Sequence, residues 1–274
     1  MRLKELALSA LAVVPLITTG CPGDDGEPMQ TTDASTGTTP STSSSTGEIT
    51  ATSVVDTTVG EESGSSSTGD APWPEFDCEG VDGVLDGNVL IESVADLAQL
   101  EGISEITRSV VINDTDLTDL DAFGCVTQIG GDLQIFGNEQ LANVDGLVNL
   151  VEIGGSETDD GNLVFTRNPL VPSFDGLQRL TRVRGSFSMN SNDGLTEISG
   201  FDSLIGVDGN FTIRDNDALT NIDGLKGLSV VGGVLAITAN PMLCLSSVAC
   251  VGEGITVPAV PPPTWSTAAN DPSC

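Results

Sequence analysis

The feature that most constrains the fold of this chain is a sequence motif that returns every 24 residues. A Gly stands seven residues before the Asn that marks each copy, and apolar residues lie five and three residues before it and three after it. The spacing is 24 residues except for the first interval, which is 30, and the marked positions are Asn138, Asn168, Asn192, Asn216 and Asn240. A fixed period of this length predicts a solenoid, in which each coil buries its apolar side against its neighbours.

The coil from Ile129 to Glu152 shows how one repeat is expected to fold. Residues 132–136 alternate apolar and polar in strand fashion, with Leu133 and Ile135 pointing inward. Asn138 follows the strand at a bend. A polar residue repeated at one position among apolar ones is expected to turn inward and to hydrogen-bond the backbone of adjacent coils, which predicts a structural Asn ladder.

Each coil continues into a short segment such as Asp145-Gly146-Leu147, where we expect the Asp to cap a helical turn. Stacked strands about 4.8 Å apart would then form a parallel sheet on at least one face. Upstream, residues 87–91 read as a first strand and Ser93 as the cap of a helix that extends to Leu100. The predicted fold is mainly β: a single-domain solenoid, or parallel β-helix, with 24-residue coils and an N-terminal capping helix.

The N-terminus is typical of an exported protein. Residues 1–20 begin with basic residues, continue with an apolar run too short to span a bilayer, and are expected to be a signal peptide. Cys21 directly follows Gly20, which resembles a bacterial lipoprotein signal and predicts lipidation of Cys21. An ordinary cleaved signal, with Cys21 free or disulfide-bonded, is the alternative. We therefore expect an outer-membrane-anchored lipoprotein of the bacterial cell envelope, attached to the membrane through this lipid alone.

Composition divides the rest of the chain into three parts. Residues 21–76 are mainly Ser, Thr, Gly and acidic residues, and are expected to form a disordered tether because they cannot offset their conformational entropy by burial. Such a tether could also be glycosylated. Residues 77–250 hold the β-helix, and residues 251–274 form a Pro-rich C-terminal tail.

The charge of the chain excludes several partners. The formal net charge is −31 at pH 7, with 9 Lys and Arg against 40 Asp and Glu. Nucleic acid and anionic lipid surfaces need clustered basic residues, so neither is expected as a partner. The acidity is expected to keep the exported protein soluble, although divalent cations remain possible ligands.

Six cysteines are compatible with disulfides in an exported protein. If Cys21 carries lipid, the remaining odd number implies a free thiol or an intermolecular bridge. Sequence proximity predicts a Cys244–Cys250 disulfide. Metal binding by these cysteines is the weaker interpretation, because the chain has no CxxC spacing and no His.

The span from about Cys78 to Cys250 resembles the receptor L-domain family, the leucine-rich-like β-helices of insulin-receptor and epidermal-growth-factor-receptor ectodomains. The phrases that carry the resemblance are Ile129-Gly130-Gly131-Asp132-Leu133-Gln134-Ile135, Asp223-Gly224-Leu225 with Leu228, and Asn240-Pro241-Met242-Leu243-Cys244. The resemblance implies a one-domain β-helix with a recognition role, and it implies no hormone ligand.

The strand register predicts which residues point outward and could contact a partner. A broad sheet surface of small polar residues with one aromatic and one basic side chain could form a ligand face: the candidates are Gln134, Phe136, Thr166, Asn190, Thr212 and Arg214. They could equally be ordinary solvated strand residues. The six extra residues of the 30-residue coil offer a second contact point, with Glu157, Asp159 and Asp160 as candidates, or a neutral surface loop.

Catalysis and cofactors have little support in the sequence. The absence of His removes the commonest general base and every His-dependent nucleophile, so no catalytic residue is assigned. The acidic runs at 114–121 and 215–217 lack the EF-hand spacing, so no metal site is assigned. We expect a noncatalytic cell-surface recognition protein, without cofactor, that binds a protein or a cell-surface glycan. A structural envelope or adhesion component is the alternative, and a polysaccharide-active enzyme is a further one.

Overall fold

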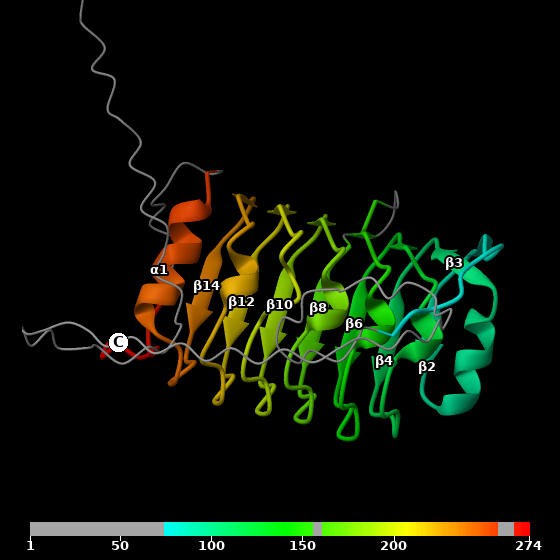
Figure 1. Ribbon diagram of the computed structural model, residues 1–274, viewed down its shortest axis with the longest axis horizontal. Coiled ribbons are helices and arrows are strands. Elements are labelled where there is room, and N and C mark those ends of the chain that lie inside the picture. Colours follow the sequence, from blue (N-terminus) through cyan, green and yellow to red (C-terminus); the bar gives the residue numbers. More distant parts are fainter. Residues whose placement is uncertain (1–73, 156–160, 257–265) are drawn as a thin grey trace, which may run out of the picture. The chain divides into compact units, whose positions relative to one another are not determined.

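The computed structural model describes residues 74–155, 161–256 and 266–274. This part of the chain is mainly β and consists of two seven-stranded parallel sheets, an arrangement consistent with a parallel β-helix. Each coil contributes one strand to each sheet, so that equivalent residues of successive coils lie side by side (Figure 1). Among these ranges, no helix has both the length and the apolar character needed to cross a bilayer.

The two sheets differ in strand length. The long-strand sheet contains, in spatial order, β2 (Val89–Ile91), β4 (Val110–Asn113), β6 (Leu133–Phe136), β8 (Leu163–Thr166), β10 (Phe187–Asn190), β12 (Phe211–Arg214) and β14 (Leu235–Thr238). The short-strand sheet contains β1 (Gly83–Leu85), β3 (Ile103–Ile106), β5 (Gln128–Ile129), β7 (Glu152–Ile153), β9 (Arg182–Val183), β11 (Gly206–Val207) and β13 (Val230–Val231). The predicted parallel sheet is therefore confirmed, and a second one faces it.

The core lies between the two sheets and follows the predicted alternation. In β6, Leu133 and Ile135 are buried while Gln134 and Phe136 are partly exposed. The register repeats this pattern without a shift through β8, β10, β12 and β14, which stacks apolar residues in continuous columns. Five phenylalanines form a chain of ring contacts through the middle coils, with centroids 4.4 to 6.2 Å apart: Phe165, Phe174, Phe187, Phe201 and Phe211.

Short 3-10 turns connect the sheets at Asp121–Phe123, Asp145–Leu147, Asp175–Leu177 and Asp223–Leu225. The expectation that the Asp caps this turn is wrong, because Asp145 is its first residue. The backbone N–H of Asp145 instead donates to Asn143 Oδ1 at 3.2 Å, two residues upstream. The Gly that follows is required by packing: a Cβ on Gly146 would lie 1.8 Å from the carbonyl oxygen of Leu120 in the preceding coil.

The N-terminal end is closed as the sequence predicts, by a helix of 3-10 type at Val94–Leu100. Its last residue, Leu100, is buried under the first coil. Ser93 is its N-cap residue, as predicted, and Asp96 Oδ2 accepts hydrogen bonds from both the backbone N–H and the hydroxyl of Ser93 at 2.9 Å. A Cys78–Cys125 disulfide ties the preceding segment to the next coil.

The C-terminal end differs from the predicted tail at 251–274. Helix α1 (Leu245–Gly254) runs across the expected boundary at residue 250. Further on, Ser266 exchanges backbone hydrogen bonds with β14, its N–H donating to Leu235 and its carbonyl accepting from Ile237. The open edge of the last parallel strand needs backbone partners, and a segment from the tail supplies them.

The predicted Cys244–Cys250 disulfide is wrong: Cys244 pairs with Cys274, and Cys250 is also disulfide-bonded. Helix α1 begins directly after Cys244, so the six-residue separation becomes an axial rise of about 9 Å. That exceeds the Cα separation a disulfide can bridge. Among the described cysteines none is a free thiol.

Candidate binding face

The outer surface of the long-strand sheet carries all six sheet candidates in two columns set by the register. One column contains Asn113, Phe136, Thr166, Asn190, Arg214 and Thr238, and its neighbour contains Leu90, Val111, Gln134, Val164, Ser188, Thr212 and Ala236. Arg214 is exposed and the other five candidates are half-buried. Phe136 and Arg214 thus share one column, three coils apart.

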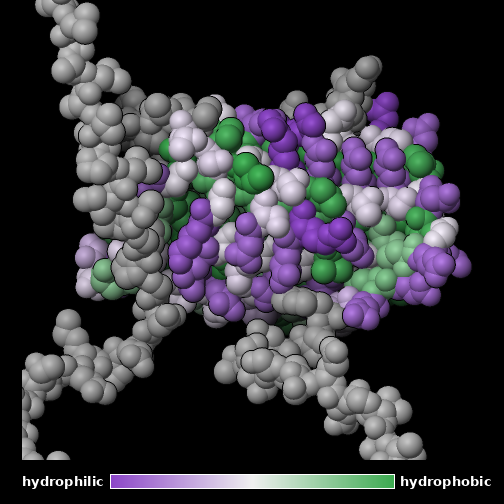
Figure 2. Space-filling view, turned by 45° about the horizontal axis from the view of Figure 1, so that its top comes forward, coloured by the Kyte–Doolittle hydropathy of each residue, from purple (hydrophilic) through white to green (hydrophobic). Residues whose placement is uncertain are grey.

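The apolar residues of this face lie toward its N-terminal end, where Leu90, half exposed, is followed in register by Val111. Toward the other end the columns consist of small, mostly polar residues together with Arg214. On the side of the molecule visible in Figure 2, hydrophilic residues predominate and the apolar ones form small separate areas. The surface therefore offers scattered apolar contacts within a polar, regularly spaced array.

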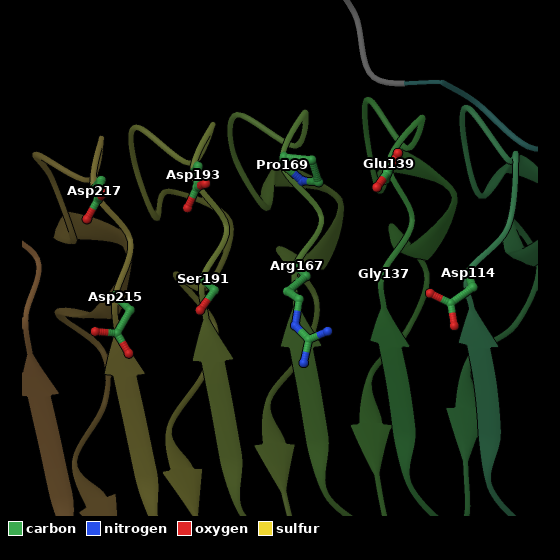
Figure 3. A pocket seen from close by; sticks show the side chains of 9 residues that line it. All are labelled: Asp114, Gly137, Glu139, Arg167, Pro169, Ser191, Asp193, Asp215 and Asp217. Carbon is green, nitrogen blue, oxygen red and sulfur yellow. The ribbon is translucent and has the colours of Figure 1, made fainter.

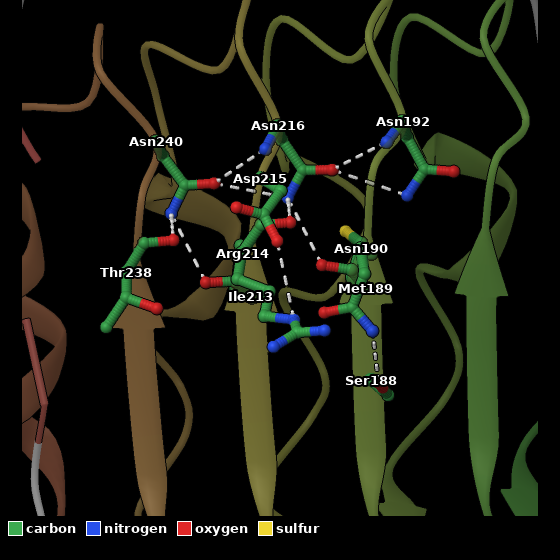
Figure 4. Close-up of polar contacts among 10 residues, drawn as sticks. All are labelled: Ser188, Met189, Asn190, Asn192, Ile213, Arg214, Asp215, Asn216, Thr238 and Asn240. Carbon is green, nitrogen blue, oxygen red and sulfur yellow. Dashed lines mark hydrogen bonds and ion pairs between the residues drawn. The ribbon is translucent and has the colours of Figure 1, made fainter. Parts of the chain in front are cut away.

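Beneath the ends of these strands lies the Asn ladder, whose five predicted members are all fully buried. The contacts of Asn192 show the pattern: its backbone N–H donates to Asn216 Oδ1 at 3.0 Å (Figure 4). Its Nδ2 also donates to the carbonyl of Phe165 at 3.2 Å. Thr115 ends the ladder at one side, and Asn270 extends it at the other by accepting from the N–H of Asn240 at 3.1 Å. The strand ends are held rigidly in register as a result.

A second ladder, which the sequence analysis missed, runs along the opposite ends of the same strands. In this ladder a side-chain oxygen accepts the backbone N–H of the next coil, as when Asn162 Oδ1 accepts from Ser186 at 2.7 Å. Its members are Asn88, Ser109, Asp132, Asn162, Ser186 and Asn210. The available signal was a short polar residue six positions before four of the five ladder Asn, the exception being Val234 before Asn240.

A groove of about 570 Å³ follows the C-terminal ends of the long strands (Figure 3). It crosses five coils and is lined by the residues on either side of the ladder position: Asp114, Gly137, Glu139, Arg167, Pro169, Ser191, Asp193, Asp215 and Asp217. The residue before the ladder position adopts a left-handed φ of 52 to 71° in each of these coils, which turns the chain sharply at the end of the strand. We call this feature the strand-end groove.

The strand-end groove is rich in unpaired charge. Asp215 has one ion pair, with Arg214 at 3.5 Å, between side chains that are both more than half exposed. Arg167 forms no ion pair with the described residues, and no hydrogen bond to another side chain engages Glu139, Asp193 or Asp217 there. Within the described ranges, no group of three or more acidic or Cys side chains is arranged to hold a metal ion.

A different row of carboxylates lies at the 3-10 turns. Desolvation by burial raises the pKa of Asp145, and repulsion from Asp175 and Asp121 raises it further. Burial, followed by the charge of Asp119, likewise raises the pKa of Asp121. Like charges stacked on successive coils are held close by the fold itself.

Several predicted sites fall outside the described residues. These are Cys21 with the signal peptide, the tether up to residue 73, and the insertion candidates Glu157, Asp159 and Asp160.

Comparison with known proteins adds no assignment: no family model, curated protein or solved structure matches the chain.

Proposed function

We propose that this chain is a noncatalytic recognition protein whose binding surface is the outer face of the long-strand sheet. The observation that carries the proposal is the regular array of outward-facing side chains, with Phe136 and Arg214 in one register column. Aromatic and Arg side chains contribute a large share of hot-spot energy in protein interfaces. Three strand steps separate the two residues by about 14 Å, a span that one epitope or a short oligosaccharide can cover.

The parts of the proposal that concern export, membrane anchoring and resemblance to a known family rest on the sequence. Export, a lipid anchor at Cys21 and a flexible stalk would place the domain at the bacterial cell envelope and present it to partners. The resemblance to receptor L-domains supports recognition through a β-helix. Arrangement in coils supports it too, because such repeat proteins bind through extended surfaces.

A structural envelope or adhesion component without a discrete ligand is the second candidate. The two polar ladders favour this candidate, because they hold the coils in a rigid register. It predicts that no soluble partner depends on the outer face.

The test is to capture partners from envelope extract with the mature chain and to measure the affinity of Phe136→Ala and Arg214→Ala variants for the partner found. Each variant should fold normally and weaken binding by about 1–2 kcal/mol, a modest hot-spot loss. Arg179→Ala, an exposed Arg outside both sheets whose guanidinium bonds Asn149, is the matched control. Wild-type affinity in both variants would remove this face as the site.

A further inference from the structure

The proposed face does not end at the strands, because each outward residue of the Phe136 column is followed directly by a residue of the strand-end groove. Phe136 precedes Gly137, Asn190 precedes Ser191, and Arg214 precedes Asp215. A partner lying on the face would therefore also contact the groove. The chemistry of the groove can then specify the partner, in an inference that rests on the proposed function.

Charge along the groove follows a defined order. Reading along the stack, the coils present Asp114, then Glu139, then Arg167, then Asp193, and finally Asp215 with Asp217. The groove thus has acidic groups at both ends and one cation at its centre. Successive coils are about 4.8 Å apart, so the pattern extends over about 19 Å.

A second observation is that the charges of the groove are not engaged elsewhere. Arg167 forms no ion pair with the described residues, and Glu139, Asp193 and Asp217 accept no hydrogen bond from another described side chain. These groups are therefore available to a partner of complementary charge.

We propose that the partner is a protein that lays an extended segment along the strand-end groove, with Lys or Arg toward both ends and an acidic residue at its centre opposite Arg167. Six residue steps of extended chain cover about 20 Å, which matches the five coils. An anionic glycan is disfavoured, because its charges would face the carboxylates at both ends.

The test uses two blocked heptapeptides of identical composition and net charge, so that general attraction to an acidic protein cannot separate them. KKAEAKK places its acid at the centre, and EKKAAKK places it at one end. Titration calorimetry at low ionic strength should show at least about threefold tighter binding of KKAEAKK, the gain expected from one additional exposed ion pair.

Variants localise the effect. Arg167→Gln should remove the preference between the peptides, whereas Arg179→Gln, an exposed Arg whose guanidinium instead bonds Asn149, should keep it. The double change Asp193→Asn with Asp217→Asn should weaken KKAEAKK binding about three- to tenfold. The same charge change at Glu92→Gln with Glu253→Gln should leave the affinity within about twofold.

Equal binding of the two peptides, or a preference that survives Arg167→Gln, would overturn the inference. Tighter binding of a galacturonate hexamer than of KKAEAKK would overturn it in favour of an anionic glycan. If the peptides do not bind as expected but Phe136→Ala still lowers the affinity for a captured partner, the binding face stands and only the proposal of a cationic segment is wrong. If Phe136→Ala and Arg214→Ala have no effect, the proposed function itself fails.

Discussion

At the scale of single residues, two ladders of polar side chains decide how the coils align. Without the side-chain amide of the ladder Asn, backbone groups at the strand end would be buried without hydrogen-bond partners. For this reason an uncharged polar residue recurs at a position surrounded by apolar ones. The amide both donates and accepts, so each Asn can bond the coil on either side. Thr115, which ends the ladder, needs only to reach one neighbour.

Asn192→Ala should lower the free energy of unfolding by roughly 1–3 kcal/mol, the cost of leaving buried partners without hydrogen bonds. The variant loses the bond that Asn192 Nδ2 donates to the carbonyl of Phe165 and the bonds that Asn192 Oδ1 accepts from Asn168, whereas its backbone N–H can still donate to Asn216. Urea unfolding followed by circular dichroism measures the effect.

Outward Thr212→Ala, for which no side-chain hydrogen bond is seen, should cost less than about 0.5 kcal/mol. Ser188→Ala is a less clean control because Ser188 accepts a bond from Asn190. If Asn192→Ala unfolds at the same urea concentration as the wild type, the ladder contributes no stability at that position.

Asp145→Asn tests the carboxylate row. Burial and the neighbours Asp175 and Asp121 raise the folded-state pKa of Asp145 above its ordinary value of 3.8. A raised pKa means that the folded state binds the proton more tightly, so the ionised group penalises folding at pH 7 and the penalty disappears as the pH falls through the raised pKa. The Asn variant should therefore be more stable at pH 7, by less than about 1 kcal/mol, and the difference should shrink on acidification.

Thermal melts of wild type and variant, from pH 7 down through the raised pKa of Asp145, provide the measurement. Glu253→Gln, which makes the same change in net charge at an exposed position of α1, is the control. A stability difference that does not change with pH would show that the charge of Asp145 is not its cause.

At the scale of elements, the two ends of the stack use different devices for the same problem. The Val94–Leu100 helix covers the first coil, whereas the last coil is covered by α1 together with residues 266–274. Asn270 joins the ladder from this distant segment, and the Cys244–Cys274 disulfide fixes it in place. The segment therefore acts as part of a coil although it lacks the repeat.

Cys274→Ser should lower the free energy of unfolding by about 2–4 kcal/mol, because the disulfide restricts the unfolded chain and anchors the segment that pairs with β14. Hydrogen exchange should show the loss of protection first at Ile237 and Ala239, whose N–H groups donate to residues 266 and 268. Cys78→Ser with Cys125→Ser serves as the comparison, with any local loss of protection confined to the other end. Uniform loss along the whole stack would contradict a local role for the closure.

At the scale of the whole molecule, function depends on how the domain is presented. Cys21→Ser should transfer the protein from the membrane fraction to soluble periplasmic or medium fractions, because a lipidated Cys would be the only attachment. Detergent partitioning followed by immunoblotting measures this. Partitioning identical to wild type would eliminate the lipid anchor and favour the alternative in which Cys21 is disulfide-bonded, because Cys250 is disulfide-bonded and the other four described cysteines pair with one another.

The sequence by itself determined the period, the strand positions, the inward and outward faces and the ladder Asn. Each of these features repeats from coil to coil, so that one local pattern occurs five times in the sequence and the strand register follows from it. Phe136 and Arg214 could be placed in one column for the same reason.

Only the tertiary structure decided the features that depend on contacts between distant or non-repeated segments. Cys274 and Asn270 reach the last coil from beyond the repeats, where no periodicity marks them, and helix α1 separates Cys244 from the cysteine nearest in sequence. The charge order of the strand-end groove likewise emerged only when coils with differing outward residues were stacked. Repetition makes local structure predictable, whereas closure and surface chemistry arise from residues that do not repeat.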